Sequence, residues 1–216
     1  PIGPEMASAS IALDAMSHIR HLLSSWPQPE GTDMGILPNL RDQLGVAILN
    51  AGLANSATSL DGVQQYAQHV INCVEGTTGT NYDASSGDPC DGFGILNHAV
   101  NSNHGTLAAA AAPQDALLAQ HSVVVGIAGK TAEDYTNSAR DAALTVLEQT
   151  SVSEAKLFTA RVIGRLETAR DGIDLDRDGS VEAVDGEGAT ALAYREAQLM
   201  STYSLVLPSS GSAIPD

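Results

Sequence analysis

The sequence has few positive charges. Lys and Arg number 10 against 26 Asp and Glu, which gives a formal net charge of −16. Binding to nucleic acid requires a basic surface that displaces counterions from phosphates, and adhesion to an anionic membrane has the same requirement. The shortage of cations therefore argues against both partners. An acidic chain of this kind is better suited to hard cations or to an extracellular setting, with acidity that serves only solubility as the alternative.

Aromatic residues and long apolar runs are also scarce. Aromatics make up 4% of the chain, while Ala, Leu and Val are plentiful. Small aliphatic residues favour helices that pack closely, and no segment combines period-two alternation with turn signals, so we expect no sheet. No stretch approaches the roughly 18 apolar residues of a membrane span. The predicted fold class is all-α, an antiparallel helical bundle ending in a helix–loop–helix hairpin.

The usual catalytic motifs are missing. The sequence contains no HExxH, no ExxH pair of the di-iron type and no CxxCH, which excludes covalent c-type haem. Its glycine-containing stretches lack the strand–turn–helix setting that a phosphate-binding loop needs. No nucleophile constellation is recognisable, so nothing in the sequence indicates an enzyme.

The chain has only two cysteines, Cys73 and Cys90, and they flank a loop rich in Gly, Thr, Ser and Asp. This placement predicts a disulfide, which would stabilise the fold by about 3 kcal/mol on the loop-entropy model. A disulfide implies an oxidising compartment. The chain begins at Pro1 without a charged-then-apolar leader, as a processed protein would. We therefore expect a secreted, periplasmic or cell-surface location; unpaired thiols in the cytosol are the alternative.

Apolar residues recur at helical spacing along most of the chain. A single domain, 1–216, is expected, with a bundle at 7–173, a loop at 174–185, a last helix at 186–201 and a frayed tail at 208–216. Within the bundle, Pro38 should lie in the first turn of a helix, and Thr58 or Ser59 should cap the next one. The predicted helices are 7–26, 38–54, 60–74, 92–112 (in spite of Gly105), 114–150 and 154–172.

Residues 174–185 carry acids at alternate positions, in the sequence DLDRDGSVEAVD. Calcium takes six to eight oxygen ligands, and a tight acidic loop can supply them. Gly179 stands sixth, where the backbone must turn at a φ that a side chain resists. The candidate ligands are Asp174, Asp176, Asp178, the Ser180 carbonyl, Glu182 and Asp185. The competing interpretation is an acidic turn without an ion.

This loop resembles the calcium loop of the EF-hand, and the Asp at its last position is similar to the dockerin variant. The resemblance implies a calcium ion that fixes the angle between the flanking helices. A dockerin has two such loops and this chain has one, so binding to a cohesin is not implied. The stretches HIRHLLSSW, GILP, AGLA, YAQHV and GFG also resemble a group of exported bacterial helical proteins with scattered histidines.

The histidines offer a second kind of ligand. Asp14, His18 and His21 are spaced i, i+4 and i+7, which places them on one strip of a helix, either as ligands for a transition metal or as its solvent face. His121 lies in an apolar stripe and should point inward, where it is hydrogen-bonded or acts as a ligand. A transition metal or b-type haem would need a second inward histidine, which His18, His69 or His104 could supply.

The function expected from the sequence is a secreted, calcium-binding helical bundle, with calcium in a structural role. A transition metal or b-type haem held by histidines is a possible addition. Two alternatives stay open: a surface or filament-forming structural subunit, rigidified by calcium, that assembles with copies of itself or with a protein partner, and a histidine-metal redox enzyme.

Overall fold

The computed structural model describes residues 13–202, and over this range the chain is helical and contains no strand. The predicted all-α class is confirmed for the described residues, and the predictions for 7–12 and 208–216 lie outside them. No described helix is both long and apolar enough to cross a membrane. The elements are α1 (Leu13–Leu23), α2 (Ile36–Ser56), α3 (Leu60–Glu75), the short 3-10 helix η2 (Ala84–Ser86), α4 (Ile95–Asn101), α5 (His104–Ala111), α6 (Ala116–Leu147), α7 (Val152–Asp171) and α8 (Thr190–Met200).

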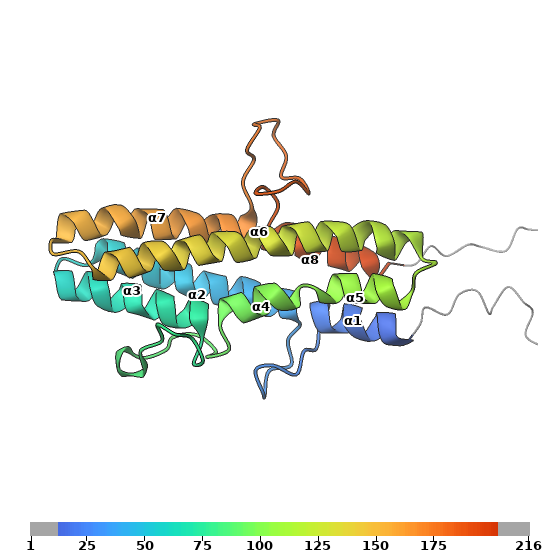
Figure 1. The fold of residues 1–216 in the computed structure, drawn as a ribbon, viewed down its shortest axis with the longest axis horizontal. Coiled ribbons are helices and arrows are strands. Elements are labelled where there is room, and N and C mark those ends of the chain that lie inside the picture. Colours follow the sequence, from blue (N-terminus) through green and yellow to red (C-terminus); the bar gives the residue numbers. More distant parts are fainter. Residues whose placement is uncertain (1–12, 203–216) are drawn as a thin grey trace, which may run out of the picture.

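The helices form an elongated bundle around α6, which runs along most of its length (Figure 1). At one end α6 packs with α7 and α3, while α2 contacts both α3 and α7. Towards the other end α6 packs with α5 and α8, and α1 contacts α5. This packing brings α1 and α5 together although they are far apart in the sequence.

Local signals set several helix ends. Ser59 caps α3, and its hydroxyl accepts a hydrogen bond from the backbone N–H of Gly62. Ser151 caps α7 through the N–H of Glu154, whose carboxylate accepts from the Ser151 hydroxyl, so the two residues form a reciprocal cap. Pro38 is the third residue of α2, as predicted.

The segment 92–112 was predicted as one helix, and this prediction is wrong, since α4 ends at Asn101 and α5 begins at His104. The backbone N–H of Ser102 bonds to Ala99 in a tighter i→i−3 pattern, which interrupts the helix. At this break α6 comes very close: a Cβ on Gly129 would lie 1.9 Å from the Ser102 hydroxyl oxygen. The interruption thus coincides with a close approach between helices.

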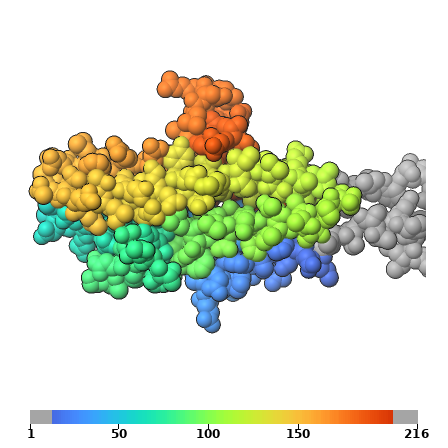
Figure 2. All heavy atoms as spheres, in the orientation of Figure 1, coloured from blue at the N-terminus to red at the C-terminus, as the bar shows by residue number. Residues whose placement is uncertain are grey.

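The last helix begins at Thr190 rather than at 186. Residues 172–189 instead form a loop that projects sideways from the bundle between α7 and α8 (Figures 1 and 2). Glu187 and Ala189 are buried at the base of this loop, where it returns to the helices.

Candidate metal centres

The projecting loop is closed at its base by backbone contacts. α7 ends at Asp171 and is followed by Gly172, which adopts φ 85°, a left-handed conformation that suits glycine. The N–H of the next residue, Ile173, donates to the carbonyl of Glu187 over 2.9 Å. The two ends of the loop are therefore joined near the helices, and the three aspartates lie in the part of the loop farther from the bundle.

Three of the predicted ligands converge within the loop. Asp174, Asp176 and Asp178 each offer a carboxylate oxygen, and these oxygens lie within 4.8 Å of one another. Both carboxylate oxygens of Asp174 accept backbone N–H groups, one from Arg177 at 2.6 Å and one from Gly179 at 2.9 Å. Gly179 has φ 97°, the left-handed turn predicted for the sixth position. The loop is folded so that its acids face one another in spite of their like charge.

The charge crowding affects Glu182. Its pKa is raised above the usual value, chiefly by the negative charge of Asp178, with burial, Asp176 and Glu187 acting in the same direction. A carboxylate whose pKa rises in this way is one that neighbouring anions repel, and a bound cation would relieve this repulsion. Glu182 thus belongs to the electrostatic cluster that Asp176 and Asp178 form.

Glu187 is an acid of this loop that sequence reasoning missed. It is buried, 1% exposed, and each of its carboxylate oxygens accepts a backbone N–H, from Leu175 at 2.7 Å and from Glu182 at 3.0 Å. It therefore joins segments on the two sides of the loop through hydrogen bonds. A twelve-residue template ends at Asp185 and stops before this residue; the only sequence signal was an acid between two glycines in DGEG.

The remaining predicted ligands, Ser180 and Asp185, are exposed to solvent. The side chain of Asp185 is outside the tight group formed by the three aspartates. Val181, the expected apolar anchor, is partly buried and packs close to Gly172. The participation of Ser180 and Asp185 in a site stays a prediction.

A second cluster lies where α1 meets α5. His18 and His21 of α1 and His104, the first residue of α5, each offer a ring nitrogen within 4.8 Å of the others. The Nδ1 atoms of His18 and His104 are 2.8 Å apart. Trp26 packs edge-on against this group, with its ring centre 5.0 Å from His21 and 4.8 Å from His104. Of the predicted strip, Asp14 is exposed and lies outside the group.

Burial and mutual repulsion favour the uncharged forms of His104 and His21. Burial lowers the pKa of His104 to about 4, and the neighbouring His18 and His21 add to the effect. The pKa of His21 is lowered by burial first, and then by His18 and Arg20. The Nδ1 atom of His21 is buried and has no hydrogen-bond partner among the described residues. A neutral imidazole with a free nitrogen is the form that binds metals.

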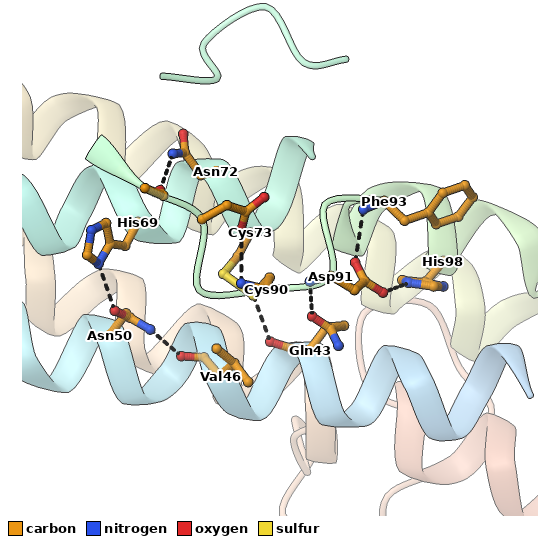
Figure 3. The surroundings of a disulfide bond; sticks show 12 residues. Gln43, Val46, Asn50, His69, Asn72, Cys73, Cys90, Asp91, Phe93 and His98 are labelled. Atoms are coloured by element: carbon orange, nitrogen blue, oxygen red, sulfur yellow. Dashed lines mark hydrogen bonds and ion pairs between the residues drawn. A yellow bond between two sulfur atoms is a disulfide. The ribbon is translucent and has the colours of Figure 1, made fainter. Parts of the chain in front are cut away.

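His69 serves a different purpose. Its Nδ1 lies 3.1 Å from the amide oxygen of Asn50 (Figure 3). Its Nε2 donates to the carbonyl of Ser86 at 2.7 Å. Ser86 belongs to the segment between Cys73 and Cys90, which form the predicted disulfide. His69 therefore fastens the cysteine loop to α2 and α3.

The buried side chain of Asn72 holds the same loop. Its amide donates to the carbonyls of Asp83 and Gly87 at 2.8 and 2.7 Å, and its oxygen accepts the N–H of Asp83 at 2.9 Å. The cysteines and Asp88 also form a potential ligand group, but the two sulfurs are bonded to each other and offer no thiolate to a metal. The disulfide and the hydrogen bonds of Asn72 attach this loop to α3, which gives the loop a structural role.

His121 and His98 each pair with a carboxylate. His121 is partly buried between α6 and α8, and its Nδ1 lies 2.7 Å from the carboxylate of Glu196. His98, which sequence reasoning left aside, is fully buried with Nε2 2.8 Å from Asp91 (Figure 3). Burial alone would raise the pKa of Asp91, but the bond and charge of His98 outweigh it and the pKa is lowered. Neither His69 nor His121 joins a group of three candidate ligands within residues 13–202.

No family model, curated protein or solved structure matches this chain. Evidence for its function therefore comes from the chemistry of its own residues.

Proposed function

We propose that this protein is an exported calcium-binding helical bundle, in which calcium occupies the projecting loop and has a structural role. The observation that carries the proposal is the convergence of Asp174, Asp176 and Asp178 within 4.8 Å, in a loop whose sixth residue, Gly179, has the left-handed φ of an EF-hand loop. The disulfide between Cys73 and Cys90 supports export, because such bonds persist in oxidising compartments.

The donor set fits calcium. Carboxylate oxygens bind calcium at about 2.4 Å, so two oxygens of one ion lie at most about 5 Å apart. The oxygens of the three aspartates meet this limit without rearrangement. Glu182 is drawn into the same negative field, and its raised pKa reflects a repulsion that a divalent cation would remove. Asp185 and the Ser180 carbonyl would complete the shell.

Calcium in this position would stiffen the link between α7 and α8. We propose that these helices form the C-terminal hairpin of an antiparallel bundle. Glu187 already closes the base of the loop through two backbone bonds, so the ion would order its distal part. Such a site suits an extracellular protein, where calcium is abundant and affinities of about 10⁻⁴ to 10⁻³ M suffice. The filament-forming subunit and the redox enzyme stay predictions from the sequence.

The test is calcium-dependent stabilisation. In chelator-treated protein, free calcium at about 100 times the dissociation constant should stabilise the fold by about 2.7 kcal/mol, which raises the melting temperature by roughly 5 to 10 °C. Asp176→Asn with Asp178→Asn should abolish this increase, because it removes two carboxylates of the cluster. Differential scanning calorimetry with and without calcium measures both.

The control carries the same change of charge elsewhere. Glu30 and Asp33 are exposed acids in the loop between α1 and α2, and Glu30→Gln with Asp33→Asn should retain the full calcium response. An equal response of the loop variant and the control, or no response of the wild type, would refute the site.

A further inference from the structure

We propose that His18, His21 and His104 form a transition-metal site, separate from the acidic loop, which binds Zn²⁺ or a similar borderline ion through three imidazoles. The site joins α1 to α5. It is independent of calcium binding and of the proposed calcium function.

The positions of the three rings match those of ligands around one ion. His18 and His21 stand three residues apart on α1, and so project from the same face of the helix. His104 reaches them from the start of α5, which packs on α1. A zinc ion binds imidazole nitrogen at about 2.0 Å, so two nitrogens of one tetrahedral ion lie about 3.3 Å apart. The nearest pair, His18 and His104, is 2.8 Å apart, so a small separation of the rings would admit the ion.

The hydrogen-bond partners of the three rings leave room for a metal. Within residues 13–202 no carboxylate is paired with these rings, in contrast to His98 and His121, which face Asp91 and Glu196. Three imidazoles without a counter-ion satisfy one another poorly by hydrogen bonding, since a pair of Nδ1 atoms shares at most one proton.

An unsatisfied nitrogen gives independent support. The Nδ1 of His21 is buried without a partner among residues 13–202, whereas buried polar atoms almost always have one. The indole N–H of Trp26, in contact with His21 and His104, is likewise buried and unpaired within the same residues. The orphaned Nδ1 of His21 is a position for a metal, whereas the Trp26 N–H can only donate a hydrogen bond and would suit a water bound to the ion.

A bare ion fits this cluster better than haem. The ring centres of His104 lie 4.9 Å from His18 and 5.0 Å from His21, so the imidazoles touch one another directly. An axial pair in a haem protein faces the iron from opposite sides of a flat macrocycle, which these contacts leave no room for. Three imidazoles around one ion leave a fourth position for water or another small ligand, and the partly exposed His18 gives access from solvent.

The experiment is a zinc titration of the full chain by calorimetry, in saturating calcium chloride so that the acidic loop is occupied. We expect one zinc ion per chain. His18→Ala should weaken zinc binding by about 100-fold or more, since even the groups that orient metal ligands are worth 10 to 100-fold. His18 is partly exposed, so this variant keeps the fold, which circular dichroism verifies.

Two further measurements make the result specific. His121→Gln removes a histidine outside the cluster and can still donate to Glu196, so zinc binding should be unchanged. Substitution with Co²⁺ should give the intense visible absorption of a four- or five-coordinate site in the wild type and lose it in His18→Ala. Absence of stoichiometric zinc binding in the wild type would overturn the proposal, as would equal affinity in His18→Ala. Loss of zinc binding in the Asp176→Asn, Asp178→Asn variant alone would also overturn it, because the zinc would then lie in the acidic loop.

Discussion

At the scale of single residues, the neighbours of each of the six histidines determine its role. His98 and His121 face carboxylates, His69 bonds to a backbone carbonyl of the cysteine loop, and His104 lies among other imidazoles. The sequence spacing identified His18 and His21 as a strip of α1, but it could not reveal that His104 joins them, because this depends on how α1 packs on α5. Glu187 was missed for a similar reason. Its carboxylate bonds to Leu175 and Glu182 only because the folded loop brings these residues together.

The histidine cluster makes stability depend on pH. The folded pKa of His104, about 4, lies below its ordinary 6.5, so the unfolded chain binds more protons between these values. The contribution of this residue is therefore complete above pH 6.5 and is lost as the pH falls toward 4. His21, whose pKa is also lowered, acts in the same direction.

We expect the free energy of unfolding, measured in urea with chelator present, to fall between pH 7.5 and 4.5, and to fall less in His104→Gln. The raised pKa of Glu182 acts in the opposite direction in both proteins and cancels in the comparison. The same pH dependence in His104→Gln as in the wild type would contradict this assignment.

At the scale of elements, helix positions were readable where local chemistry decides them. Ser59, one of the two predicted candidates, caps α3, and Pro38 lies in a first turn as predicted. The break between α4 and α5 was missed. It lies in the polar run NSNHG at 101–105, whose residues are common in turns, and Gly129 of α6 packs against it.

That close packing predicts opposite outcomes for two glycines of α6. A Cβ at Gly129 would lie 2.9 Å from the Cβ of Ser102 as well as against its hydroxyl, whereas at Gly126 the nearest atom is 3.9 Å away. Gly129→Ala should destabilise the protein by about 1 to 3 kcal/mol through overpacking. Gly126→Ala should stabilise it by up to about 1 kcal/mol, because alanine favours the helix. Urea unfolding compares the two, and equal effects would show that α4, α5 and α6 are not packed so tightly.

At the scale of the whole molecule, the two long loops lie on opposite sides of the bundle. The acidic loop projects from one side and the cysteine loop covers the other (Figure 1). The cysteine loop is held both by its disulfide and by the side chains of His69 and Asn72. Since the loops share no residues or partners, their contributions to stability should add.

Replacement of both cysteines by serine should therefore lower the free energy of unfolding by about 3 kcal/mol, the value for a loop of this length. The increment from calcium should stay the same as in the wild type. Chemical denaturation of both proteins, each with and without calcium, measures the two terms. A calcium increment that shrinks in the serine variant would indicate that the bundle couples the loops.

The contact between Trp26 and the histidines has a practical consequence. Trp26 is the only tryptophan in the chain, and its ring lies against His21 and His104. Its fluorescence emission therefore comes from a single position beside the cluster, where protonation of an imidazole or arrival of a paramagnetic ion would quench it. The molecule thus carries an intrinsic optical probe for that corner of the bundle.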